Sequence, residues 1–213
     1  MRVDLFALCA EHGFDLGEVF SALDQVYRDI DARNERNTAG LSLPCHAGCD
    51  ACCKESVFLT PLEFLGAWDL LQRSISDAQL EGIVAAFLTL YERNRDLIVG
   101  LSRPPAAGES DHLRLALQLR YLCPLLDAAG ACRIYARREL YGRLFGCSFN
   151  DDSGIYGCPL VGKHLAGQVV TLLSVRRTAK AFNDLPLTHK RQVYPYYVHA
   201  LYGKNGRPAE LFG

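Results

Sequence analysis

Four cysteines lie within nine residues of one segment, CHAGCDACC, and they are Cys45, Cys49, Cys52 and Cys53. Thiolates bind zinc and iron–sulfur clusters, and the C-x2-C spacing of Cys49 and Cys52 lets two sulfurs reach one ion around a tight turn. Cys52 and Cys53 are adjacent, so their side chains diverge in an extended chain or an α-helix. We therefore expect metal binding here, with this pair serving two sites or placing one thiol beside the metal.

A second group of cysteines follows later in the chain, and it consists of Cys123, Cys132, Cys147 and Cys158. The segment CPLLDAAGAC has Asp127 and Gly130 near its middle, which favours a turn that returns Cys132 to the neighbourhood of Cys123. Two ligands would then arrive together. The eight cysteines of the two groups are enough for one metal site with spare thiols or for two sites of four ligands each.

Composition narrows the class of protein. The chain has 213 residues, 49% of them hydrophobic, and a formal net charge of -1, so it can bury one core, and its composition gives no indication of a basic surface for nucleic acid or an anionic membrane. The apolar run near the N-terminus is too short for a signal peptide or a membrane span, which predicts a cytoplasmic protein. Nine cysteines in a reducing compartment favour metal or redox chemistry over disulfides, and Cys9, the odd one, should be a buried thiol.

Helical patterns surround the first cysteine segment. Apolar positions recur at helical spacing from Leu16 to about Arg36, and Ser56–Leu59 is a candidate strand. Thr60 with Glu63, and Ser76 with Gln79, match capping boxes that open helices running to about residues 73 and 98.

The second half of the chain predicts a linker and further helices. SRPPAAG, residues 102–108, is the candidate linker, and alternation over 113–121 favours a strand, with a helix as the alternative. Helices are expected over 134–145, 162–182 and 189–202. The predicted fold is mostly α, a single compact domain over 1–213 with short strands or a turn around a metal-binding core at about 44–158 and C-terminal helices at 162–202.

A family resemblance follows from these motifs. CHAGCDACC followed by VFLTPLEF, and later CPLLDAAGACRIYARRELYGRLF, resembles the YkgJ-type cysteine-cluster family over roughly residues 44–147. That family carries a CxxCxxCC signature, is described as a zinc- or iron-chelating domain, and is similar to a region of flagellin lysine N-methylases. The resemblance implies that Cys45, Cys49, Cys52, Cys53, Cys123 and Cys132 are metal ligands and that Arg138 and Arg143 are the family's arginines.

The chain departs from the family pattern at two places. Cys45 stands one residue further from Cys49 than the signature has it. Where the family commonly reads R-P-x-x-C-R, this chain reads RELYGR, so Glu139 replaces a proline and Gly142 replaces a cysteine. Cys147 is the nearer substitute for that missing ligand and Cys158 is the alternative, each requiring the loop GCSFNDDSGIYGCP to fold back over the site.

Arginines gather around the second cysteine group, namely Arg133, Arg137, Arg138 and Arg143. Cations offset the negative charge of thiolate sites, which is the simpler interpretation. The sharper one is an anion-binding pocket beside the metal, in which Arg138 and Arg143 bind an acidic substrate or a cofactor carboxylate.

Three functional hypotheses follow. The first is a cytoplasmic protein holding an iron–sulfur cluster, of the four-iron kind, or zinc, in which all eight cysteines of the two groups are candidate ligands. The second is a redox or methyl-transferring enzyme that uses the metal beside the arginines on a small anionic or protein substrate, and the third is a structural zinc module. The spacing C-x3-C-x2-C also matches radical S-adenosylmethionine enzymes, but Ala51 stands where those enzymes place an aromatic residue, and the strand and helix alternation of their barrel is absent.

Overall fold

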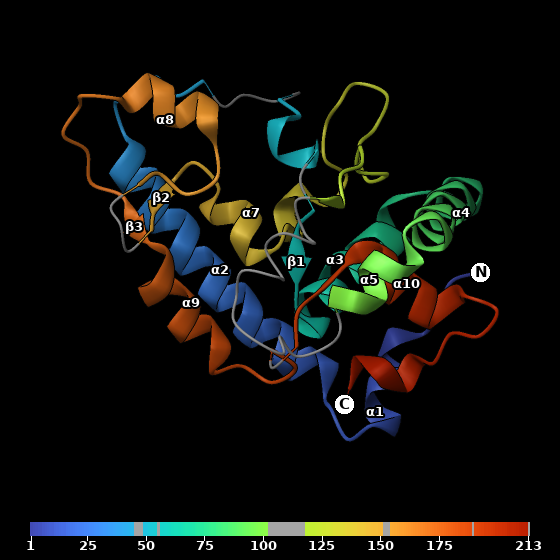
Figure 1. Ribbon diagram of the computed structural model, residues 1–213. Helices are drawn as coiled ribbons and strands as arrows, with labels where there is room; N and C mark the ends of the chain where they lie inside the picture. The colour runs from blue at the N-terminus through green and yellow to red at the C-terminus, as the bar shows by residue number, and fades with distance from the viewer. Residues whose placement is uncertain (45–48, 55, 102–117, 151–153, 189, 213) are drawn as a thin grey trace.

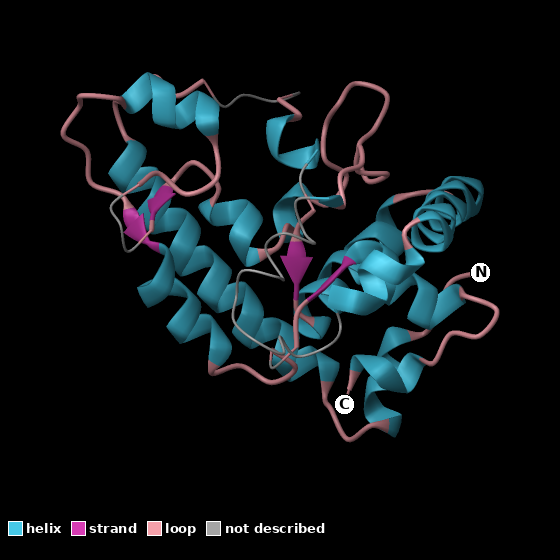
Figure 2. Cartoon of the chain, viewed as in Figure 1, coloured by secondary structure: helices cyan, strands magenta, loops and turns pink. Residues whose placement is uncertain are grey.

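Helices make up most of the structure, with short strands and turns between them, as Figure 2 shows. The computed structural model describes the chain outside residues 45–48, 55, 102–117, 151–153, 189 and 213. The predicted fold class, a mostly α protein, is confirmed. No helix in the described ranges combines the length and the apolar character that crossing a bilayer requires.

The first half of the chain holds the longest helices. In order, its elements are α1 (Leu5–Glu11), α2 (Leu16–Thr38), the 3-10 turn η1 (Ala51–Lys54), β1 (Phe58–Leu59), α3 (Pro61–Ser74), α4 (Asp77–Arg93) and α5 (Arg95–Leu101). Figure 1 shows α2 crossing the molecule, with α9 lying alongside it.

The second half consists of shorter elements. They are η2 (Tyr135–Arg137), α7 (Leu140–Leu144), β2 (Ser148–Phe149), α8 (Pro159–Leu165), β3 (Leu173–Ser174), α9 (Val175–Asn183), β4 (Gln192–Val193), α10 (Tyr194–Tyr202) and η3 (Pro208–Leu211). β1 pairs antiparallel with β4, and β2 pairs in parallel with β3. The β1–β4 pair joins the starts of α3 and α10, although these helices lie far apart in the sequence.

Both predicted capping boxes are present, and α3 and α4 begin at the residues that the capping boxes predict. The Thr60 hydroxyl accepts from the Glu63 N–H at 3.3 Å, and the Glu63 carboxylate accepts from the Thr60 N–H at 2.7 Å. Ser76 and Gln79 make the same reciprocal contacts at the start of α4. These local hydrogen bonds satisfy backbone donors that a helix leaves free at its N-terminus, so the sequence alone fixes these helix starts.

Several predicted helices end earlier than the sequence suggests. The helix expected to run to residue 98 stops at Arg93, where the Asn94 side chain caps the Leu90 carbonyl at 2.9 Å and α5 then begins. The single helix expected over 162–182 is wrong, because α8 ends at Leu165 and α9 begins only at Val175. Gly167 lies between them with φ +78°, a conformation that ends a helix.

Other expectations were met in part. The helix expected over 134–145 is two pieces, η2 and α7, and that over 189–202 begins at Tyr194 after β4. The linker at 102–108 and most of the strand at 113–121 lie outside the described residues, and 119–121 are not strand.

The core lies between α3, α4 and α10 and is rich in aromatic side chains. Phe64 stacks on Trp68 and on Tyr197, with ring centroids 5.3 and 5.0 Å apart, and Phe87 stacks on Tyr194 at 5.8 Å. Cys9 is buried against this core from α1, as expected, and burial raises the pKa of its thiol to about 11. It therefore behaves as a small apolar residue.

Candidate metal centre

The two cysteine segments lie against each other. The Cys123 N–H donates to the Cys53 carbonyl at 3.0 Å, which ties η1 to the segment that follows residue 118. Figure 1 shows η1 and the loop containing Cys123 and Cys132 side by side at the top of the view. Residues far apart in the sequence are thus brought together by a backbone contact.

The predicted turn between Cys123 and Cys132 is confirmed. The Asp127 carboxylate accepts from the Ala129 and Ala131 N–H groups at 2.9 and 2.8 Å, as an Asx turn does. Gly130 has φ +78°, which suits glycine. A bridge between Leu126 and Cys132 closes the turn, so the second cysteine returns beside the first.

Five cysteines line one cavity of about 500 Å³, and they are Cys49, Cys52, Cys53, Cys123 and Cys132. Among the residues that the structure describes, no three His, Cys, Asp or Glu side chains already have the geometry of a metal site. The fold therefore gathers the thiols around one space, and closing them on a metal needs side-chain rotation. Cys45 lies outside the described residues.

The adjacent cysteines Cys52 and Cys53 line the same cavity, although adjacent side chains diverge in an extended chain or an α-helix. They belong to the 3-10 turn η1 rather than to an extended strand or an α-helix. A hydrogen bond from Cys53 and, less strongly, the Arg138 guanidinium lower the pKa of Cys52 to about 6, against the opposing effect of burial. The same hydrogen bond and burial raise the pKa of Cys53. One thiolate thus forms readily at neutral pH.

The thiols of the second segment are harder to ionise. Burial raises the pKa of Cys123 to about 12 and also raises that of Cys132. A metal ion supplies the positive charge that lets such buried thiols deprotonate, so metal binding here would release protons.

Cys147 and Cys158 are not among the residues that line this cavity. They lie close to β2 and α8, where Cys158 precedes α8 and the Cβ of Cys158 would contact a side chain at Gly146 at 3.0 Å. Figure 1 shows α8, β2 and β3 together, apart from β1 and η1. The loop that contains these two cysteines does not put them where the family cysteine at position 142 would stand.

The two arginines expected to bind an anion have different positions. Arg138 lines the cavity, with its guanidinium 4.4 Å from the ring centroid of Tyr135, and no carboxylate in the described part of the chain pairs with it. Arg143 is buried instead, where it pairs with Asp31, donates to the carbonyls of Ala136 and Arg138, and stacks over a tyrosine ring. Its contacts hold the backbone that carries Arg138.

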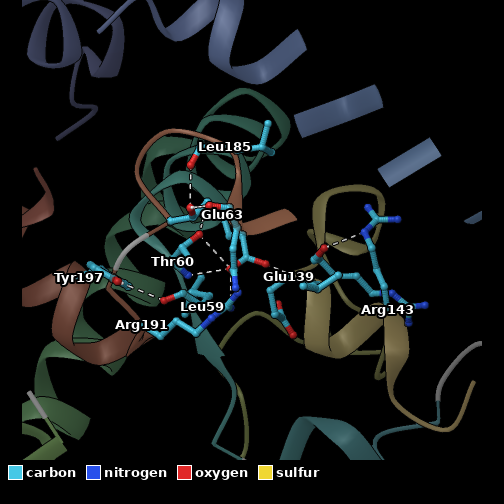
Figure 3. A network of polar contacts seen from close by, with 12 residues as sticks. Leu59, Thr60, Glu63, Glu139, Arg143, Leu185, Arg191 and Tyr197 are labelled. Atoms are coloured by element: carbon cyan, nitrogen blue, oxygen red, sulfur yellow. Dashed lines mark hydrogen bonds and ion pairs between the residues drawn. The ribbon is translucent and has the colours of Figure 1, made fainter. Parts of the chain in front are cut away.

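A buried carboxylate, Glu63, fixes the segment that enters α7 (Figure 3). Its oxygens accept from the Tyr27 hydroxyl at 3.3 Å, from the Leu140 N–H at 2.6 Å and from Arg191 at 3.2 Å, in addition to the capping contacts with Thr60. Five donors on one carboxylate join α2, α3, α7 and the approach to β4. This network places the residues just before Leu140 at the wall of the cavity.

Glu139 is one of those wall residues, although it is not among the site residues predicted from the sequence. It is 7% exposed, and the Tyr194 hydroxyl donates to its Oε2 at 3.3 Å. Burial and the charge of Glu63 raise its pKa to about 7, although its own backbone N–H and Arg138 oppose this. The sequence signal that could have revealed it is its position three residues before Gly142, which makes Glu139 the N-cap of α7 and puts Gly142 in the first turn of that helix.

Comparisons with family models, with curated protein sequences and with solved structures find no match to this chain. The family resemblance of the cysteine segments therefore stays an expectation.

The donors present fit a metal that prefers sulfur. Every cysteine of the cavity is a free thiol, and the side chains around them include Arg138 as a compensating cation. Cys52, Cys53, Cys123 and Cys132 would hold zinc or an iron–sulfur cluster through sulfur, as such centres are usually held.

Proposed function

We propose that this protein binds a metal centre between η1 and the turn from Cys123 to Cys132. One observation carries the proposal: five cysteines from two segments, joined by the Cys53–Cys123 backbone hydrogen bond, line a single cavity. A protein core needs no such concentration of thiols, and Cys9 shows how a packing cysteine is used in this chain, alone among apolar side chains.

An iron–sulfur cluster of the four-iron kind is our first choice, and zinc is the second. The described residues that line the cavity include five cysteines and no histidine, which suits a cluster held by thiolates alone, whereas zinc sites often include histidine. The resemblance of the two cysteine segments to a zinc- or iron-chelating family supports either metal. Free thiols suit a reducing compartment, which supports a cytoplasmic location.

The experiment is anaerobic purification followed by a visible spectrum and by assays of iron, acid-labile sulfide and zinc. Brown protein with stoichiometric iron and sulfide establishes the cluster, whereas colourless protein loaded with zinc establishes the zinc site. Protein that retains neither metal, and takes up neither when supplied under reducing conditions, contradicts the proposal.

A second candidate function, a redox or methyl-transferring enzyme, is favoured by Arg138. Its guanidinium stands at the cavity wall without a carboxylate partner in the described residues, and guanidinium groups recognise anions. A small anionic substrate could then lie beside the metal. The check is whether Arg138→Gln weakens the binding of candidate carboxylates or phosphates while leaving metal content unchanged.

A further inference from the structure

Glu139 is a buried acidic side chain that faces the thiols. It lines the same cavity as Cys52, Cys123 and Cys132, and it is 7% exposed. In the described part of the chain, the Tyr194 hydroxyl is the one side-chain donor that contacts it, and that contact is to Oε2. Oε1 is left without a donor from another described residue.

The neighbouring carboxylate shows how this protein satisfies a buried acid that serves structure. Glu63 receives five donors, and one of them is the charged Arg191. Glu139 has no such set, although both residues are almost fully buried. A buried carboxylate with so few partners carries a desolvation cost that a bound cation would offset.

The position of the Glu139 carboxylate coincides with that of a side chain at residue 142. A Cβ added to Gly142 would overlap with Glu139 Oε1, so a side chain at position 142 would require the Glu139 carboxylate to move. Both residues line the cavity. The Glu139 oxygen therefore stands where a thiol at position 142 would begin.

We propose that Glu139 supplies an oxygen ligand to the metal that the cysteines hold. This inference rests on the proposed metal-binding function and deepens it, because it makes the centre a mixed sulfur and oxygen site rather than an all-thiolate one. A carboxylate ligand is harder than a thiolate, so ligation by Glu139 would shift the choice from the four-iron cluster to a single zinc or ferrous ion.

The test is a Co²⁺ titration of the metal-free protein, followed by absorption spectroscopy. Co²⁺ is the probe because its visible bands report the geometry and the ligands of the site. Glu139→Gln should weaken Co²⁺ binding at least about tenfold and shift the visible bands, since an amide is a poorer ligand than a carboxylate. Glu81→Gln, the same change at an exposed position of α4, is the matched control and should bind as the unmodified protein does.

A rescue variant separates ligation from a general effect on folding. Glu139→Ala combined with Gly142→Cys clears the space and supplies a thiol, so it should bind Co²⁺ more tightly than Glu139→Ala alone, with stronger sulfur-to-metal absorption. A double variant no tighter than the single one would overturn the shared position that the inference requires.

The outcomes also separate this inference from the proposed function. If the unmodified protein binds Co²⁺, and Glu139→Gln binds it equally well with the same spectrum, Glu139 is not a ligand and the cysteine site stands. If the unmodified protein binds no Co²⁺, zinc or iron under reducing conditions, both proposals fail. Circular dichroism of the metal-free variants checks that each one is folded.

Discussion

The backbone N–H of Cys123 donates to the carbonyl of Cys53 at 3.0 Å, so two cysteine segments from different halves of the chain share one hydrogen bond. Because that contact is between backbones, it persists when either thiol is replaced. Cysteine variants therefore test ligation more directly than they test assembly of the site.

Serine variants should lose metal when the replaced cysteine lines the cavity and should keep it when the cysteine lies elsewhere. Cys52→Ser or Cys132→Ser removes a thiol of the cavity and should lower metal affinity at least about tenfold, because a hydroxyl is a much weaker ligand for zinc or iron. Cys158→Ser, which changes a thiol outside the cavity, should keep the metal. Metal content after dialysis against a chelator is the measurement, and equal loss from Cys158→Ser and Cys52→Ser would show that the division is wrong.

Cys52 should be the most reactive thiol of the metal-free protein. Its pKa is lowered to about 6, first by the hydrogen bond from Cys53 and then by Arg138, so the thiolate forms as the pH rises through 6 rather than near 8.5. The rate of iodoacetamide modification at Cys52, followed by peptide mass spectrometry, should therefore reach half its maximum near pH 6. Cys53→Ala should move this midpoint upward, and Arg138→Gln should move it upward by less.

The capping boxes predicted the starts of α3 and α4 correctly because capping needs only nearby residues. The Thr60–Glu63 box depends on a spacing of three, which the sequence displays directly. The helix predicted over 162–182 failed because apolar spacing alone does not show burial. Val169, an apolar residue within that range, is fully exposed, and Gly167 has the positive φ that ends α8.

The candidate site was predictable in part. The spacing of the first segment and the Asp127–Gly130 turn pointed to a shared site, and both segments now line one cavity. The direction of the Cys52 and Cys53 side chains was not predictable, because it depends on a 3-10 turn that no capping signal marks. The spacing of Glu139 to Gly142 relates these two residues to each other but does not place Glu139 at the cavity, since that position follows from the contact of Glu63 with the Leu140 N–H.

Replacing Arg143 should lower the stability of the fold, whereas replacing Arg138 should not. Arg143→Lys removes the planar group that contacts Asp31 and two carbonyls, and should lower the free energy of unfolding by about 2 kcal/mol. This is less than a fully buried pair costs, because the Asp31 side chain is 52% exposed. Arg138→Lys should leave stability nearly unchanged, since Arg138 makes no ion pair with a described residue. Urea unfolding of both variants is the measurement, and an equal loss of stability would contradict this assignment.

Glu139 should make the metal-free protein less stable as the pH rises. Its pKa is raised from an ordinary 4.5 to about 7, chiefly by burial, so between these values the folded protein holds a proton that the unfolded chain has lost. The free energy of unfolding therefore falls as the pH rises from about 4.5 to 7, by about 3 kcal/mol in total at 1.36 kcal/mol per pKa unit.

Glu139→Gln should remove this pH dependence, because glutamine stays neutral. The metal-free variant should then be more stable than the unmodified protein at pH 8, and the difference should shrink at pH 4.5. Urea unfolding at several pH values in the presence of a chelator is the measurement, with Glu81→Gln as the control. A variant less stable than the unmodified protein at pH 8 would show that the Glu139 carboxylate stabilises the metal-free fold. A stabilised metal-free variant that also binds Co²⁺ more weakly is the combination expected of a metal ligand, since a residue retained for packing would lose stability when replaced.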